Sequence, residues 1–255
     1  MKIPSASFFF CAAVLLSNTA AAQQHKAVDG GPQSVPTVAL QDREWFAYRG
    51  YYQTFVRFRD KEQPARYPFL RIRLRVWPSR PNLPMDGLVL QLVSASVDQL
   101  LPVDPIAGVD LPLSGLAAEE DGLLRLNRAK GSYTVSVQYS VQVRPDGVYA
   151  MEWLKSACEQ GFSVRKTFGL SYFLASVTKS CVGITFYFPE SAPQASVVLR
   201  DAGAVDRPLP MERVPYFGHG SLPHVGVVRY KFRDGPQDGK LVTRVQPQVI
   251  DFILE

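Results

Sequence analysis

Arginines alternate with apolar residues in the segment PFLRIRLRVWP at residues 68–78. Because successive side chains of a strand point to opposite faces, Arg71, Arg73 and Arg75 are expected to share one face. A guanidinium group suits two-point contacts with carboxylate and phosphate groups. The face is therefore solvated, neutralised by acidic groups of the same chain, or occupied by an anionic partner. A half-buried strand needs one polar face, which favours the solvated interpretation.

A second alternation, Val56-Arg57-Phe58-Arg59, precedes that segment. Aromatic residues between positions 45 and 55 also fit helical spacing, but Gly50 and the alternation favour a strand for the end of this stretch. If the two strands pair, their guanidinium groups crowd one sheet face, where like charges opposite one another are destabilising. Solvent, an acidic neighbour or an anionic ligand would offset that cost. The candidate anion-binding residues are Arg57, Arg59, Arg71, Arg73 and Arg75.

Three other groups of residues have types that catalysis or metal binding uses. Ser176 and Lys179 match the S-x-x-K motif of penicillin-interacting enzymes, but neither S-D-N nor K-T-G follows. His219 and His224 lack further ligands at metal-binding spacing and indicate exposed loop histidines. The run Glu119–Asp121 offers paired carboxylates, but it indicates a solvated turn or a counter-charge for the arginine face. We therefore predict no catalytic residue, no metal ligand and no cofactor.

The first 22 residues have the layout of a secretory signal peptide. Lys2 is followed by an apolar run at 8–16 and by small residues that suit signal peptidase, so we expect cleavage between Ala22 and Gln23. A membrane-spanning helix needs about 20 apolar residues, and neither this run nor a later segment reaches that length. We therefore expect a periplasmic or secreted protein with no transmembrane segment in the mature chain.

Two cysteines remain once Cys11 is removed with the leader. In an oxidising compartment, Cys158 and Cys181 are expected to form a disulfide. The loop that it would close has about 24 residues, and the chain-entropy model gives such a loop roughly 3 kcal/mol of stabilisation. Two buried free thiols are the alternative.

Positive charge is concentrated near the start of the mature chain. The formal net charge is +5, and removal of Lys2 with the leader lowers it to +4. Between Arg43 and Arg80 there are ten Arg or Lys residues but only three Asp or Glu residues. This region would attract an anionic partner, whereas an exported chain of small total charge disfavours nucleic acid.

Short strand patterns separated by turn residues dominate the mature chain, and we expect an α+β fold of predominantly antiparallel strands. One main helix is predicted, because Asp146 is a good N-cap, apolar residues then recur at helical spacing, and Gly161 suits the position after the last turn. The strand candidates are 69–77, 88–93, 99–103, 109–113, 123–126, 133–143, 181–189, 196–200, 226–232, 241–245 and 249–254.

A change in composition near Pro145 is the best candidate for a domain boundary. We predict a signal peptide at 1–22, a flexible arm at 23–41, a sandwich-like β-rich domain at 42–144, and an α+β domain with the helix and the disulfide at 145–255.

Several short motifs resemble a family of uncharacterised exported bacterial proteins. They are LPVD at 101–104, LPL at 111–113, LNR at 126–128, DGVY at 146–149 and VVRYKF at 227–232. The resemblance extends over most of the mature chain, but it implies no activity and no site residues. The spacing of the hairpin motifs in LPVD…G…LPL is also similar to that in transthyretin-like β-sandwich modules.

Together these observations favour a non-enzymatic envelope protein that binds or assists a partner. The partner would be an anionic envelope component, such as a glycan or a lipid phosphate, or another protein. Two alternatives stay open: a hydrolase that acts on a cell-envelope polymer, and a structural subunit of an envelope assembly.

Overall fold

The computed structural model describes residues 43–59, 67–166, 178–201, 203, 205–218, 220, 222–236 and 238–255. The contacts of this part of the chain belong to one compact unit, Val38–Glu255. The predicted signal peptide, its cleavage site at Ala22 and Gln23, and the arm at 23–41 lie outside the described residues.

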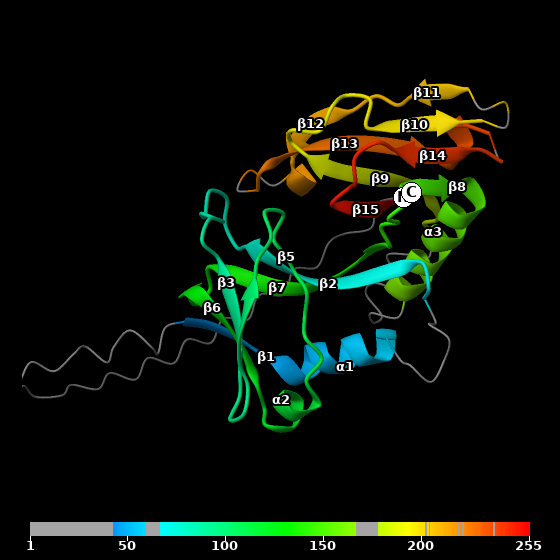
Figure 1. Ribbon diagram of the computed structural model, residues 1–255. Helices are drawn as coiled ribbons and strands as arrows, with labels where there is room; N and C mark the ends of the chain where they lie inside the picture. Colours follow the sequence, from blue (N-terminus) through cyan, green and yellow to red (C-terminus); the bar gives the residue numbers. More distant parts are fainter. Residues whose placement is uncertain are drawn as a thin grey trace, which may run out of the picture. The chain divides into compact units, whose positions relative to one another are not determined.

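The N-terminal half contains two antiparallel sheets (Figure 1). One has the order β1-β6-β3-β4, and the other has the order β5-β2-β7. Their strands are β1 (Arg43–Ala47), β2 (Leu70–Pro78), β3 (Val89–Val93), β4 (Asp98–Pro102), β5 (Gly108–Val109), β6 (Leu123–Ala129) and β7 (Tyr133–Val141). Two helices accompany them, α1 (Tyr48–Arg59) and the short α2 (Gly115–Glu119).

Both sheets and α1 share one hydrophobic core. Leu90 and Leu92 of β3 are fully buried there, because alternate residues of that strand point inward. The aliphatic side chains of β2 enter the same core from the second sheet. This arrangement agrees with the predicted packing of two β layers in the N-terminal half.

The strand predicted for residues 56–59 is wrong, because these residues form the end of α1. Tyr48, Phe55 and Phe58 recur at helical spacing and are all buried in the core. Gly50 has no atom near the position that a Cβ would take, so it lies on the open side of the helix. The helical period over the whole segment therefore outweighs a four-residue alternation.

The C-terminal half contains two further antiparallel sheets, with the orders β11-β10-β14-β8 and β12-β13-β9-β15. Their strands are β8 (Val148–Ala150), β9 (Cys181–Pro189), β10 (Val197–Arg200), β11 (Asp206–Pro208), β12 (Glu212–Pro215), β13 (His224–Lys231), β14 (Lys240–Thr243) and β15 (Val249–Leu254). The helical segments are α3 (Met151–Lys166), η2 (Tyr216–Gly218) and η3 (Phe232–Asp234). Side chains from both sheets and from α3 meet in a second core.

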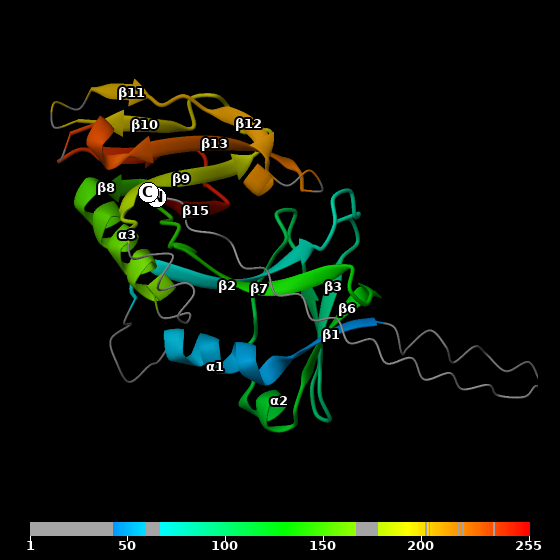
Figure 2. The same cartoon turned by 180° about the vertical axis from the view of Figure 1, so that it is seen from behind.

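The sheet of β2 and β7 is a middle layer. Figures 1 and 2 show these strands between α1 on one side and the C-terminal strands on the other. Ile72 and Leu74 enter the core that α1 shares, whereas Arg75 on the opposite face reaches Tyr216 of η2. A third core, which includes Ile106, Tyr187 and Tyr216, lies on that opposite side. Both faces of β2 are therefore covered by other elements along part of its length.

The main helix is present, but its predicted limits are wrong at both ends. Residues 148–150 pair with β14 as β8, and the helix begins only at Met151. Asp146 instead pairs with Arg144 at 2.6 Å. Gly161 lies inside the helix, where a Cβ would overlap the ring of Phe252. Its lack of a side chain therefore permits the close approach of β15 to α3.

The disulfide prediction is confirmed. Cys158 of α3 is bonded to Cys181 at the start of β9, and their Cα atoms are 5.7 Å apart. The link ties the helix to the sheet that it packs against. No helix among the described residues is long and apolar enough to cross a membrane.

The fold class is confirmed as α+β with mainly antiparallel strands. Most predicted strands are present to within a few residues, but of the strand predicted at 109–113 only Val109 is in a strand, as the second residue of β5. The division into domains at residue 145 stays a prediction. The short strands β1, β8, β11 and β12 were not predicted.

Candidate binding site

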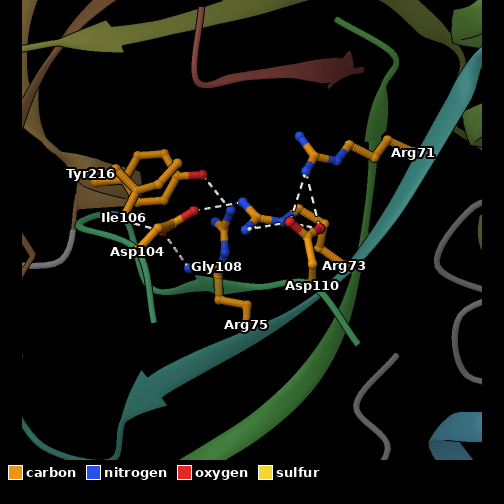
Figure 3. Close-up of polar contacts among 8 residues, drawn as sticks. All are labelled: Arg71, Arg73, Arg75, Asp104, Ile106, Gly108, Asp110 and Tyr216. Atoms are coloured by element: carbon orange, nitrogen blue, oxygen red, sulfur yellow. Dashed lines mark hydrogen bonds and ion pairs between the residues drawn. The ribbon is translucent and has the colours of Figure 1, made fainter. Parts of the chain in front are cut away.

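The arginines of β2 lie on one face, as predicted, but acidic side chains of the same chain neutralise two of them (Figure 3). Asp110 accepts hydrogen bonds from Arg71 Nη2 at 3.0 Å and from Arg73 Nε at 2.9 Å. Asp104 accepts from Arg73 Nη1 at 2.6 Å. Although burial opposes its ionisation, the charges of Arg73 and Arg71 lower the pKa of Asp110 below its usual value. The negative charge that balances Arg71 and Arg73 therefore comes from carboxylates of the protein itself.

A tight turn before β5 places Asp104 for this contact. Its Oδ1 accepts hydrogen bonds from the backbone N–H groups of Ile106 at 3.0 Å and Gly108 at 2.7 Å. Its Oδ2 is thereby directed at Arg73. A Cβ at residue 108 would lie 2.7 Å from that oxygen, so the turn and the ion pair together require glycine.

Arg75 contradicts the solvated interpretation, since it is only 1% exposed. Its Nη2 donates a hydrogen bond to the Tyr216 hydroxyl. Its Cζ lies 4.6–5.1 Å from the ring centroids of Tyr216, Phe217 and Trp77. Among the described residues, Nε and Nη1 have no hydrogen-bond partner. Burial lowers the pKa of Arg75, while Tyr216 opposes that shift. Aromatic rings thus take the place of a carboxylate around this cation.

Arg57 does not join this face. Arg57 is exposed on α1, which packs against the aliphatic face of β2 rather than pairing with it. The side chain of Arg59 lies outside the described part of the structure. The five arginines therefore do not form the common sheet surface that two paired strands would have produced.

A cavity of about 860 Å³ lies beside the arginine face, and we name it the edge cavity. Its wall combines aromatic and polar side chains from both halves of the chain. The principal contributors are Tyr51 and Thr54 of α1, residues 136–139 of β7, Arg165 of α3, Phe217 of η2, Asp251 and Phe252 of β15, and Lys179. A volume of this size is typical of sites for small ligands.

Charged groups of both signs reach the edge cavity. Arg165 and Lys179 supply two positive charges, and Asp251 supplies the carboxyl group. Burial raises the pKa of Asp251 to about 6, although the Phe252 N–H and the charges of Arg75 and Arg165 oppose that shift. At weakly acidic pH the carboxyl group of Asp251 is therefore largely neutral.

The edge cavity and the buried arginine share a wall. Phe217 lines the cavity and also contacts the Arg75 guanidinium. Ser136 of the lining lies opposite Arg75 in the strand register and accepts a hydrogen bond from Trp77 Nε1 at 2.9 Å. Arg75 therefore packs against an aromatic ring that also lines the cavity.

The other sequence motifs do not form a catalytic group in the described residues. Ser176 and His219 lie outside them. Lys179 lies outside any helix and lines the edge cavity, and His224 is an exposed residue at the start of β13. In this described portion, no group of three or more His, Cys, Asp or Glu residues is placed to hold a metal ion.

The acidic run at 119–121 serves local structure. Glu120 accepts hydrogen bonds from the Ser94 hydroxyl at 2.6 Å and from the Ser96 backbone N–H at 2.9 Å. Asp121 pairs with Arg49 of α1 at 2.9 Å. The alternative that this run neutralises the arginine face is wrong, because Asp104 and Asp110 do so.

Sequence reasoning missed Asp104, Asp110, Tyr216 and Asp251. The first two flank β5, whose pairing with β2 brings them to the arginines from more than 30 positions away. Tyr216 lies 141 positions from Arg75. Their residue types carried a weak signal at most, because only the long-range strand order places them together.

Comparisons with protein-family models, with curated proteins and with solved structures give no match for this chain. The resemblance to uncharacterised exported bacterial proteins stays a prediction.

Proposed function

We propose that this protein is exported to the cell envelope and is a non-enzymatic binding protein for an anionic component there. The observation that carries the proposal is the edge cavity, in which Arg165 and Lys179 accompany aromatic side chains such as Tyr51 and Phe252. The aromatic wall suits the apolar or planar part of a ligand, and the two cations suit its negative charge.

Binding is favoured over hydrolysis by the groups that line this cavity. Hydrolysis of a glycosidic bond ordinarily uses a pair of carboxyl groups. The described lining contributes one, that of Asp251. The same site therefore supports recognition of an anion better than it supports a glycosidase.

Export is supported by two features. The leader at 1–22 has the order of charge, apolar run and small residues that signal peptidase recognises. The Cys158–Cys181 disulfide is typical of proteins in oxidising compartments. Fractionation of cells that express the full chain would test this part, with the processed protein expected outside the cytoplasm.

The ligand class is tested with the purified exported protein and defined probes. Uronic-acid oligosaccharides and phosphatidylglycerol vesicles separate a glycan from a lipid phosphate, and phosphatidylcholine vesicles serve as the neutral control. Replacing Arg165→Gln together with Lys179→Gln should weaken binding of the anionic probe about tenfold or more, since charged hydrogen bonds contribute roughly 1.5–3 kcal/mol each.

Two matched controls accompany that variant. Lys130→Gln removes an exposed cation from the turn between β6 and β7, outside the cavity lining. Arg71→Ser removes a cation whose charge is already neutralised by Asp110. Both controls should bind like the unchanged protein. Equal affinity of the double cavity variant would overturn the proposal.

A further inference from the structure

The edge cavity is bounded by the open edge of a β-strand. The strand order β5-β2-β7 leaves β7 with a single strand partner in the described part of the chain. Four consecutive β7 residues, 136–139, line the cavity. The lining also includes residues of α1 and of β15, which lie on opposite sides of this sheet, so the cavity extends around the edge of β7.

The backbone groups on that edge follow from the register. The Gln142 N–H donates to Phe69 O, so the even-numbered residues of β7 direct their backbone groups at β2. In an antiparallel pair the intervening residues direct theirs away from the partner strand. The N–H and C=O of Val137 therefore point out from the open edge, in the middle of the cavity lining.

One neighbouring group on this edge is already capped. The Val135 carbonyl accepts a hydrogen bond of 2.9 Å from the Tyr51 hydroxyl of α1. This contact supports the assignment of the odd-numbered residues to the open edge. Proteins ordinarily cover or block such edges because they pair readily with other chains. Within the described residues, the outward backbone groups of Val137 have no such cap, and Val137 lines the cavity.

Resting on the proposed function, we propose that the ligand of the edge cavity is an extended peptide segment bearing a carboxylate, which adds as a strand to β7. Its backbone would exchange hydrogen bonds with Val137, as in known cases of strand addition. Its acidic group would be held by Arg165 and Lys179, which gives the charge complementarity that selects this occupant. Aromatic residues of the wall, such as Phe252, would contact its apolar side chains.

The protein side of this contact is tested at one residue. Val137→Pro removes the outward N–H but leaves the β2–β7 hydrogen bonds of the even-numbered residues, and proline is tolerated at such edge positions. Val137→Ala shortens the side chain and keeps the N–H. The probe is the blocked peptide TVEVT, measured by calorimetry. We expect Val137→Pro to weaken its binding at least tenfold and Val137→Ala to change it less than threefold.

The peptide side gives an independent measurement if the proline variant unfolds. Two N-methylated versions of the probe are compared, one methylated at its odd-numbered amides and one at its even-numbered amides. Methylation of the amides that face β7 should abolish binding, and methylation of the amides that face away should leave binding nearly unchanged. Replacing its glutamate by glutamine should weaken binding to the same extent as the Arg165→Gln, Lys179→Gln variant does. Equal binding of both N-methylated peptides would overturn strand addition.

The outcomes separate the two proposals. Binding of the oligosaccharide or phosphatidylglycerol that depends on Arg165 and Lys179, together with no binding of TVEVT, would overturn the peptide proposal and leave the proposed function standing. If no anionic probe, including the peptide, depends on the two cations, both proposals fail.

Discussion

Arg75 shows how a residue that resembles a surface cation can be part of the interior. It is buried, it contacts three aromatic rings, and no carboxylate of the described residues lies within ion-pair distance of it. A buried charge of this kind is weak evidence for stability, because apolar replacement is often neutral or favourable. Its hydrogen bond to Tyr216 is the contact whose loss should be costly.

A double-mutant cycle tests that assignment. Tyr216→Phe should lower the free energy of unfolding by about 1–3 kcal/mol, because it leaves another N–H of Arg75 unsatisfied. In an Arg75→Met background the same change should cost almost nothing, because the guanidinium group that needs a partner is no longer there. Urea unfolding of the four proteins gives the coupling. Equal cost of Tyr216→Phe in both backgrounds would show that the hydrogen bond is unimportant.

The raised pKa of Asp251 predicts that the stability of the protein depends on pH. Its pKa is raised from 3.8 to about 6 by burial, so the folded state holds its proton more tightly than the unfolded state does. This tighter proton binding stabilises the folded state fully below pH 4, and the stabilisation is lost as the pH rises to 6. The free energy of unfolding should fall by at most about 3 kcal/mol over this range, since each pKa unit corresponds to 1.36 kcal/mol. Asp251→Asn should remove this dependence, and its free energy of unfolding should exceed that of the wild type at pH 7.5. Urea unfolding at pH 4 and 7.5 measures the difference; parallel profiles for both proteins would contradict it.

At the level of elements, two helical glycines should respond in opposite ways to the same substitution. Gly161→Ala places a Cβ against the Phe252 ring and should lower the melting temperature, because α3 and β15 must separate. Gly50→Ala meets nothing within 4 Å in α1, and it should raise stability by about 0.5–1 kcal/mol through backbone entropy. Thermal unfolding measures the melting temperature of both variants. A higher melting temperature for Gly161→Ala would contradict the prediction.

Local sequence patterns predicted the secondary-structure elements better than they predicted which residues pack around those elements. The alternation at Arg71, Arg73 and Arg75 correctly predicted a strand with its cations on one face. It carried no information about the layer that covers that face, because the cover comes from Asp104, Asp110 and Tyr216 through distant strand pairing. For the same reason the edge cavity was not predicted.

The errors at α1 and α3 have local causes. Four alternating residues at 56–59 are too few to distinguish a strand from the last turn of a helix whose buried residues are Tyr48, Phe55 and Phe58. Residues 148–150 fit a helical pattern, but pairing with β14 makes them a strand. Gly161 was assigned to a helix end by its type, although its role is to admit the ring of Phe252.

At the scale of the whole molecule, the disulfide connects stability to the edge cavity. It joins α3, which supplies Arg165, to the start of β9, two positions after Lys179. Both cations of the cavity are therefore close in sequence to the link. The pair is separated by 23 positions, and a loop of that length is worth about 3 kcal/mol in the chain-entropy model.

Cys158→Ser with Cys181→Ser should therefore lower the free energy of unfolding by about 3 kcal/mol. Reductant should destabilise the wild type to the same level and leave the double variant unchanged, which separates loss of the bond from loss of packing. If the link also holds Arg165 and Lys179 at a common spacing, the reduced protein should bind its anionic probe more weakly while still folded. Calorimetry below the unfolding transition, with and without reductant, measures this. Unchanged affinity would mean that the sheets alone hold the cavity open, and that the disulfide contributes only to stability.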